Sequence, residues 1–214
     1  MILVGQYDSP FVRRIAVTLH HYGMPFTRDR TSVFSPTMAN VNPLVRIPSV
    51  ILDGGETLWD STAILDYLDE QVAADITLTP RSGQPRRRVL RASALAVGAV
   101  EKAGAVVYER HLHKPDCVST EWVERCLGQL AGALSYLDET AREPWFFGEE
   151  MSQTDIMIGC AVGYLRLRLE EAFPRSRYPK LEALASRCNA LDEFVRTQPA
   201  PDEVMPPKGT ARRS

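Results

Sequence analysis

The chain has 214 residues, of which 44% are apolar and 24% are charged, and its formal net charge is −2. A chain of this size can bury a substantial core, and it fits one large domain or two small ones. The charge balance gives no argument for binding nucleic acid or an anionic membrane. We therefore expect neither as a partner.

The four cysteines all lie in the second half of the chain, at Cys117, Cys126, Cys160 and Cys188. They form no CxxC pair and have no zinc-finger spacing with a histidine, so we expect free thiols and no metal site. The N-terminus has no signal-peptide pattern. The longest apolar run, residues 156–165, is about half a membrane span. The sequence therefore predicts a soluble protein of the cytoplasm.

The first part of the chain alternates short strand-like and helical segments. Residues 2–4 form a short apolar strand signal, and residues 10–22 follow as a helix with one apolar stripe. Gly23 and Pro25 end this helix. A weak and polar strand is then predicted over residues 26–31. This order indicates a β-α-β beginning.

A hairpin and a helix come next. Residues 35–43 look irregular, with at most one helical turn, whereas 50–52 and 57–59 are apolar runs separated by Asp-Gly-Gly-Glu. This spacing is a hairpin signal. Ser61 then caps a helix with an apolar face. Because strands and helices alternate early and antiparallel strands come late, we expect a mixed four-stranded sheet.

The second half of the chain is predicted to be all helical. Residues 77–85 carry two prolines and a glycine, so they read as a linker between two units. The expected helices cover residues 86–110, 120–141, 154–171 and 181–195. The final residues, 198–214, are rich in proline and offer little to bury, which predicts a disordered tail.

The helix predicted from residue 154 has the strongest local signal. Ser152 and Asp155 form a capping-box-like start with Asp in place of the usual Glu. The residues that follow are apolar almost all round, which is typical of a central core helix. Gly159 and Gly163 would allow neighbouring elements to approach closely. Asp155 is therefore expected to be structural rather than catalytic.

Four local motifs together resemble those of a glutathione S-transferase. They are Ser9-Pro10-Phe11 after the first strand, Ile47-Pro48 before the third, Asp60-Ser61 at a helix start, and Ser152-x-x-Asp155. Each is weak alone, but their joint order over about residues 1–197 is specific. The stretch SPFVRR is most similar to a bacterial subgroup with serine at this position.

The resemblance implies a two-domain protein that uses glutathione. A thioredoxin-like glutathione-binding domain would cover residues 1–76 and an all-helical domain residues 86–197, joined by the linker at 77–85. Glutathione would be the cosubstrate, and a small hydrophobic electrophile would lie in the cleft between the domains. Two subunits would form a homodimer, and conjugation would serve detoxification.

Ser9 is the candidate catalytic residue. The nucleophile is the thiolate, so lowering a thiol pKa of about 8.5 by roughly two units needs about 2.7 kcal/mol. A hydroxyl that donates to a charged acceptor contributes about 1.5–3 kcal/mol, and a helix N-terminus adds about 0.3–1 kcal/mol. The alternative is that Ser9 only caps its own helix. A serine cannot form a mixed disulfide with glutathione, which favours conjugation over redox chemistry.

The resemblance assigns further residues to glutathione binding. Phe11 belongs to the Ser9 motif. Arg46 would meet the glycyl carboxylate, although an exposed loop charge fits equally well. Ile47 would pair its N–H and C=O with the cysteinyl part, as an added strand does, in front of a cis Pro48. A plain strand-opening proline remains the alternative.

The γ-glutamyl end would bind at the start of the next helix. The hydroxyl and N–H of Ser61 would take the α-carboxylate, since helix N-termini favour anions. Asp60 would pair with the ammonium group, although many relatives carry the longer Glu or Gln here. Arg13 and Arg14 either raise the local positive potential or are solvated surface residues.

Residues outside these motifs stay open. Tyr108, Lys102 and Trp122 either line the electrophile pocket or belong to the core. Arg86, Arg87, Arg88 and Arg91 crowd a helix start, which suggests acidic partners or a solvated surface.

Three functions compete at this point. The first is a glutathione transferase. The second is a non-catalytic binding or regulatory protein of the same shape, since fold does not fix function. The third is a glutathione-dependent reductase or isomerase, of which a thiol-disulfide version would need a cysteine at position 9.

Overall fold

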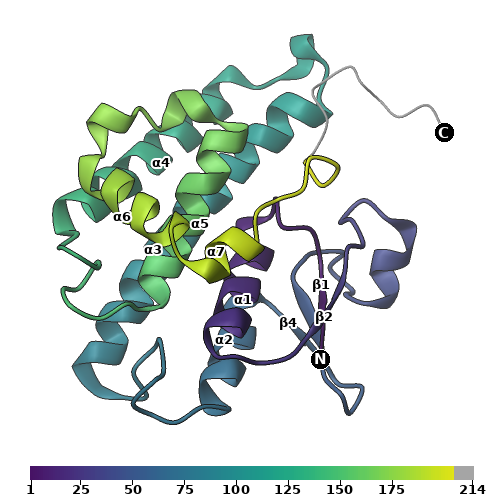
Figure 1. Cartoon of the computed structure of the whole chain (residues 1–214). Helices are drawn as coiled ribbons and strands as arrows, with labels where there is room; N and C mark the ends of the chain where they lie inside the picture. Colours follow the sequence, from purple (N-terminus) through teal and green to yellow (C-terminus); the bar gives the residue numbers. More distant parts are fainter. Residues whose placement is uncertain (205–214) are drawn as a thin grey trace.

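The structure, a computed structural model, describes residues 1–204, and a small sheet unit packs beside a larger helical unit (Figure 1). The sheet is mixed and four-stranded, and all later elements are helical. This confirms the expected fold class of a thioredoxin-like N-terminal domain followed by a helical domain. Residues 205–214 of the predicted tail lie outside the described part of the chain.

The sheet has the strand order β2-β1-β3-β4. β1 runs parallel to β2, and the two other pairs, β1 with β3 and β3 with β4, are antiparallel. In this register Leu3 lies opposite both Arg28 and Val50. The strands are β1 (Ile2–Val4), β2 (Thr27–Asp29), β3 (Ser49–Ile51) and β4 (Thr57–Trp59).

Helices α1 (Pro10–His21) and α2 (Ser61–Glu70) bury their apolar stripes against the sheet. The turn from β1 into α1 requires a glycine. Gly5 has a φ of +136°, and a Cβ there would lie 2.6 Å from a methyl carbon of Val12. Any side chain at this position would therefore push α1 away from the sheet.

The helical unit packs around α5 (Gln153–Arg168), which is buried along most of its length. The helices around it are α3 (Gly83–Leu112), α4 (Thr120–Thr140), α6 (Pro179–Asn189) and α7 (Asp192–Arg196). Short 3₁₀ turns occur at Pro36–Asn40, Pro115–Cys117, Glu170–Ala172 and Arg175–Arg177.

The start of α5 confirms the predicted capping box. The Asp155 carboxylate accepts hydrogen bonds from the N–H of Ser152 at 2.8 Å and of Phe146 at 2.6 Å, and from the Ser152 hydroxyl at 2.8 Å. Both glycines of α5 are close-approach sites, as expected. A Cβ at Gly159 would lie 2.9 Å from the Phe194 ring, and one at Gly163 would lie 2.8 Å from an Arg13 nitrogen.

Several predicted boundaries are wrong. The carboxylate of Asp60, not the Ser61 hydroxyl, caps α2, because it accepts from Thr62 N at 2.7 Å and Ala63 N at 3.3 Å. The helix predicted over 181–195 breaks at Leu191, whose extended backbone lets Phe194 pack against α5.

The structure adds detail to the predicted linker and to the beginning of the predicted tail. The long helix α3 already begins at Gly83, and Leu78 is buried and accepts a hydrogen bond from the N–H of Gln153. Residues 198–204, assigned to a disordered tail, pack on the sheet unit and bury Glu203. Within residues 1–204, no helix combines the length and hydropathy that crossing a bilayer requires.

Candidate functional site

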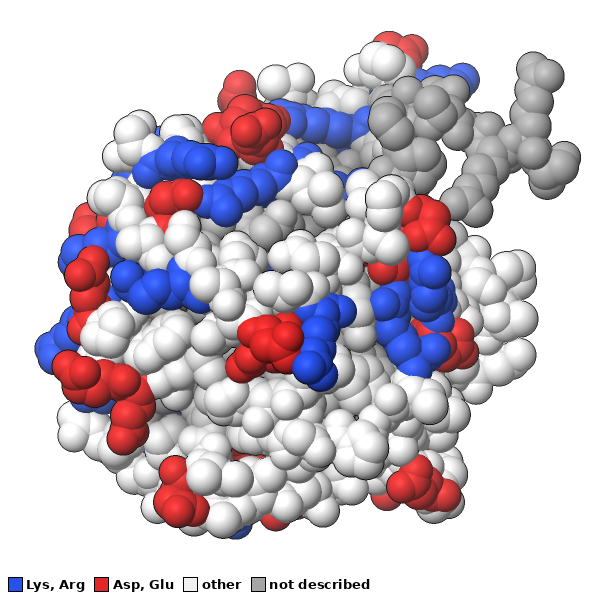
Figure 2. All heavy atoms as spheres, viewed as in Figure 1, with Lys and Arg blue, Asp and Glu red and all other residues white. Residues whose placement is uncertain are grey.

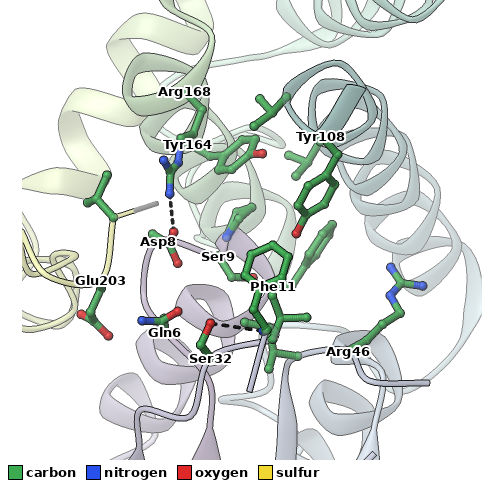
Figure 3. Close-up of a pocket in the computed structure, with 18 of the residues that line it drawn as sticks. Gln6, Asp8, Ser9, Phe11, Ser32, Arg46, Tyr108, Tyr164, Arg168 and Glu203 are labelled. Carbon is green, nitrogen blue, oxygen red and sulfur yellow. Dashed lines mark hydrogen bonds and ion pairs between the residues drawn. The ribbon is translucent and has the colours of Figure 1, made fainter. Parts of the chain in front are cut away.

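A cavity of about 960 Å³ lies where the sheet unit meets the helical unit. Ser9 and Phe11 enter it from α1, Tyr108 from α3 and Tyr164 from α5 (Figure 3). The wall formed by α3 includes Val100, Ala105 and Leu112 and is mostly apolar. The cavity therefore joins polar groups of the first unit to an apolar surface of the second.

The geometry of Ser9 shows a helix cap and leaves room for its second expected role. It is the N-cap of α1, followed by Pro10, and its Oγ accepts from the N–H of Val12 at 3.5 Å. This contact is long and uses an oxygen lone pair, so the hydroxyl proton stays available to a ligand in the cavity. Capping a helix and donating to a thiolate are thus compatible.

The loop before β3 forms another edge of the cavity. The side chain of Asn42 organises it, donating to the C=O of Arg46 at 2.9 Å and accepting from the N–H of Leu44 at 2.9 Å. Val45 takes a positive φ of 52°, which is rare for a β-branched residue. Such conformations persist only where neighbours hold them, and they cluster at ligand sites.

Arg46 and Ile47 follow on this loop and line the cavity. The Arg46 side chain is 64% exposed and lies 3.9 Å from Glu101, so solvent screens this ion pair strongly. The Ile47–Pro48 peptide bond is cis. Among residues 1–204, no hydrogen bond reaches the N–H or C=O of Ile47, which leaves both groups available to an extended peptide.

Three of the predicted site residues, Pro48, Asp60 and Ser61, do not line the cavity. Ser61 is buried, and its Oγ accepts from Arg14 at 2.6 Å. Asp60 has a φ of +68°, and its carboxylate caps α2. The cavity between the two units and the start of α2 are thus separate places rather than one pocket.

Of the two alternatives for Arg13 and Arg14, a solvated surface position is wrong, because both side chains are buried. Arg13 donates to the C=O of Phe194 at 3.2 Å. Burial lowers the pKa of Arg14 to about 10, against the attraction of Asp60 and Cys160. Arg14 still carries its proton at neutral pH, so a buried positive charge lies within hydrogen-bond distance of the Ser61 hydroxyl.

Two tyrosines place hydroxyl groups in the cavity. Burial raises the pKa of Tyr108, with Asp8 adding to the effect and Arg168 and Arg46 opposing it. Burial likewise raises the pKa of Tyr164. Both phenols therefore remain protonated near neutral pH and can donate hydrogen bonds.

Only some of the residues that line the cavity were predicted from the sequence. Tyr108 does line the cavity, whereas Lys102 lies over the Trp122 ring at 6.0 Å, and neither of these two lines it. Tyr164 and the pair of Asp8 with Arg168, 2.5 Å apart, were missed. The sequence does contain a signal for Tyr164. It lies one helical turn before Arg168, at the basic C-terminal end of α5, the helix with the strongest sequence pattern.

The charges on the surface agree with the near-neutral composition. In the face drawn in Figure 2, basic and acidic side chains intermix rather than forming one large patch of a single charge. Arg86, from the predicted basic cluster, pairs with Asp66 at 2.8 Å. Within residues 1–204, no three His, Cys, Asp or Glu side chains gather in a way that could hold a metal ion.

Comparison with known proteins identifies the family of the chain. Family models described as "Glutathione S-transferase, N-terminal domain" and "Glutathione S-transferase, C-terminal domain" match residues 8–71 and 120–185. A probable maleylacetoacetate isomerase of Vibrio cholerae is 27% identical, over 93% of this chain and 95% of its own.

Solved structures share the fold of this chain over nearly its whole length. The glutathione S-transferase of Methylobacillus flagellatus with glutathione bound is 28% identical, with a TM-score of 0.88 over 93% of this chain and 99% of its own. A glutathione transferase family member from Pseudomonas fluorescens Pf-5, with bound S-(propanoic acid)-glutathione, is 31% identical. Its TM-score is 0.78, over 94% of this chain and 100% of its own. The chain therefore belongs to the glutathione S-transferase family.

Proposed function

We propose that the protein is a glutathione transferase in which Ser9 activates the thiol of glutathione. One observation carries the proposal: the Ser9 hydroxyl lies at the N-terminus of α1 and lines a large cavity with an apolar far wall. A hydrogen bond to a charged acceptor and the helix dipole together supply about 2–4 kcal/mol. Lowering a thiol pKa by about two units needs about 2.7 kcal/mol.

The loop before β3 and the start of α2 would hold the tripeptide. The N–H and C=O of Ile47, next to Pro48, suit the cysteinyl backbone, and Arg46 suits the glycyl carboxylate. Phe11 would contact the ligand from α1. At the α2 terminus, Ser61 would bind the γ-glutamyl carboxylate and Asp60 the ammonium group.

The carboxylate of Asp60 supports this assignment less directly, since it already caps two N–H groups. Each carboxylate oxygen has more than one lone pair, so an ammonium group can still share it.

The second substrate would be a hydrophobic electrophile held against α3 and α5. Val100, Ala105 and Leu112 supply apolar surface on one side of the cavity, and Tyr108 and Tyr164 supply phenolic donors. A donor near the reacting centre can stabilise the negative charge that develops as the thiolate attacks.

We further propose a role for each domain, a subgroup, a subunit arrangement and a cellular location. Residues 1–76 would act as the glutathione-binding domain and residues 86–197 as the domain for the second substrate. The SPF motif supports the bacterial serine-type subgroup. We also propose a cytoplasmic homodimer that serves detoxification.

A glutathione-dependent isomerase is the second candidate. It is favoured by the relative named as a probable maleylacetoacetate isomerase. An isomerase would use the same thiolate, which adds to a double bond and is later eliminated, so that glutathione is not consumed.

A thermal-shift titration with glutathione, paired with an assay on a chromogenic electrophile, tests the proposal. Glutathione at about 100 times its dissociation constant should stabilise the fold by about 2.7 kcal/mol. Consumption of glutathione during turnover distinguishes the transferase from the isomerase. An absent shift in the wild-type protein would instead favour a non-catalytic binding or regulatory protein of this fold.

A further inference from the structure

The segment that follows α7 returns from the helical unit to the sheet unit (Figure 1) and buries an acidic side chain there. The side chain of Glu203 is 1% exposed. One carboxylate oxygen accepts from the N–H of Tyr7 at 3.3 Å and forms an ion pair with Arg28, and the other accepts from the N–H of Ala200 at 3.1 Å. A buried charge persists only with partners of this kind.

The N–H of Tyr7 belongs to the short loop that presents Ser9. Within residues 1–204, the polar contacts of its backbone and of Asp8 include four that hold this loop in place. Two lie within the sheet unit: Gly5 N donates to the C=O of Asp29 at 2.8 Å, and Ser9 N donates to the C=O of Gln6 at 3.1 Å.

The other two contacts come from the helical unit and its C-terminal extension. They are the hydrogen bond from Tyr7 N to Glu203 and the ion pair between Asp8 and Arg168. Figure 3 shows Glu203 and Arg168 on the same side of the cavity as Asp8. The residues directly before Ser9 are thus held from outside the sheet unit.

The Arg28 guanidinium connects the buried carboxylate to the Tyr7 side chain. It lies over the Tyr7 ring, with its central carbon 3.6 Å from the ring centroid, while it pairs with Glu203. Backbone and side chain of Tyr7 are therefore fixed by one acid–base pair. A shift of this pair would move the turn that ends in Ser9.

We propose that Glu203 is a positioning residue: through the N–H of Tyr7 it holds the loop that places the Ser9 hydroxyl in the cavity. The C-terminal segment is then part of the site rather than a tail. The catalytic consequence rests on the proposed transferase function, whereas the structural claim about the loop does not.

Amide-resolved hydrogen exchange on the ligand-free protein tests the structural claim. We expect the Tyr7 amide of Glu203→Ala to lose protection about tenfold or more, the effect of removing a hydrogen bond to a charged group. Glu203→Gln keeps one carbonyl oxygen for this N–H, so it should retain part of the protection. Asp192→Ala, which removes an exposed acid paired with Arg196 on α7, should leave Tyr7 unchanged.

Two results would overturn the claim. One is unchanged Tyr7 protection in a folded Glu203→Ala variant. The other is a loss that is equal at Tyr7 and at the core amides of α5, because it would report only lower global stability. If Glu203→Ala does not fold, the same comparison is made between Glu203→Gln and wild type.

The catalytic arm measures the pKa of the bound glutathione thiol from its ultraviolet absorbance. In Glu203→Ala this pKa should lie between those of wild type and Ser9→Ala, so the loss of rate should shrink at alkaline pH. A rate loss that is equal at every pH would contradict positioning. If wild type itself fails to lower the thiol pKa, the proposed function fails, and the exchange experiment still decides the role of Glu203.

Discussion

The Nη2 atom of Arg14 donates a 2.6 Å hydrogen bond to the hydroxyl oxygen of Ser61. Arginine has only donors, so Ser61 must act as the acceptor in this contact. The hydroxyl proton of Ser61 is thereby directed elsewhere and can be donated to a ligand. A buried cation in α1 thus fixes the first residue of α2 as an acceptor and leaves its hydroxyl proton free to be donated.

Replacing Arg14 tests this relationship. We expect Arg14→Ala to lower the free energy of unfolding by about 1–3 kcal/mol, because it removes the donor to the buried Ser61 hydroxyl and to the exposed Thr62. It should also weaken glutathione binding, since the positive charge behind Ser61 is lost. Denaturant unfolding and calorimetric titration measure the two effects. Arg196→Ala, at an exposed ion pair, should change stability by under about 1 kcal/mol and leave binding unaltered.

The Ser9→Ala variant should show whether Ser9 acts on the glutathione thiol or only caps α1. We expect the pKa of bound glutathione to rise and the rate of attack at neutral pH to fall about tenfold or more, because the lost hydrogen bond is worth at least about 1.5 kcal/mol. The matched control is Ser119→Ala. Ser119 caps α4 with the same geometry, accepting from Trp122 N at 3.3 Å, and does not line the cavity.

Both serine variants lose a cap, so each should lose about 0.5–2 kcal/mol of stability. Only Ser9→Ala should change the thiol pKa. If the two variants show the same rate, Ser9 is a cap and nothing more.

Asp155 should matter for stability alone. Its carboxylate accepts three hydrogen bonds and is completely buried, so removing it leaves several donors unpaired. We expect Asp155→Ala to cost about 2 kcal/mol or more, above the usual effect of one cap. The denaturation midpoint measures this loss, and the rate per folded molecule should match wild type. A lowered rate in fully folded protein would argue against a structural role.

The accessible thiol provides a further check on the packing. Cys117 is exposed, whereas Cys126, Cys160 and Cys188 are buried. A thiol reagent should therefore react quickly with one group in the native protein and with all four after denaturation. Cys117→Ser should abolish the fast phase. A fast phase that persists in that variant would mean that the helical unit opens locally.

Features that depend on residues close together in the sequence could be predicted from it. The capping box at Ser152 and Asp155 and the apolar run after it predicted α5, because all of these residues act within one helix. Glycine at positions 159 and 163 also signalled close packing, although not which residues would approach.

The failures concern contacts between distant segments. A solvated surface position was one of two expectations for Arg13 and Arg14, since arginine is seldom buried without a partner. Their partners lie far along the chain, at Ser61 and Phe194. Glu203 was assigned to a disordered, proline-rich tail for the same reason, because its partners Tyr7 and Arg28 lie far away in the sequence, in the sheet unit.

The buried thiols predict how stability changes in alkaline solution. Burial raises the pKa of Cys160 to about 11, against the lowering effect of Arg13 and Arg14. Between about pH 9 and this value, the unfolded chain loses a proton that the folded protein keeps. Cys160 therefore makes the free energy of unfolding fall as the pH rises through this window, and its contribution is about 1.36 kcal/mol for each unit.

Cys160→Ala removes this group and should flatten the fall. The substitution also leaves a small void and lowers stability at every pH, so the slopes of unfolding free energy against pH are compared rather than the absolute values. Denaturant unfolding of both proteins from pH 8 to 10.5, spanning about two units around the ionisation of a free thiol, gives these slopes. Equal slopes in the two proteins would show that Cys160 ionises as readily in the folded state as in the unfolded chain.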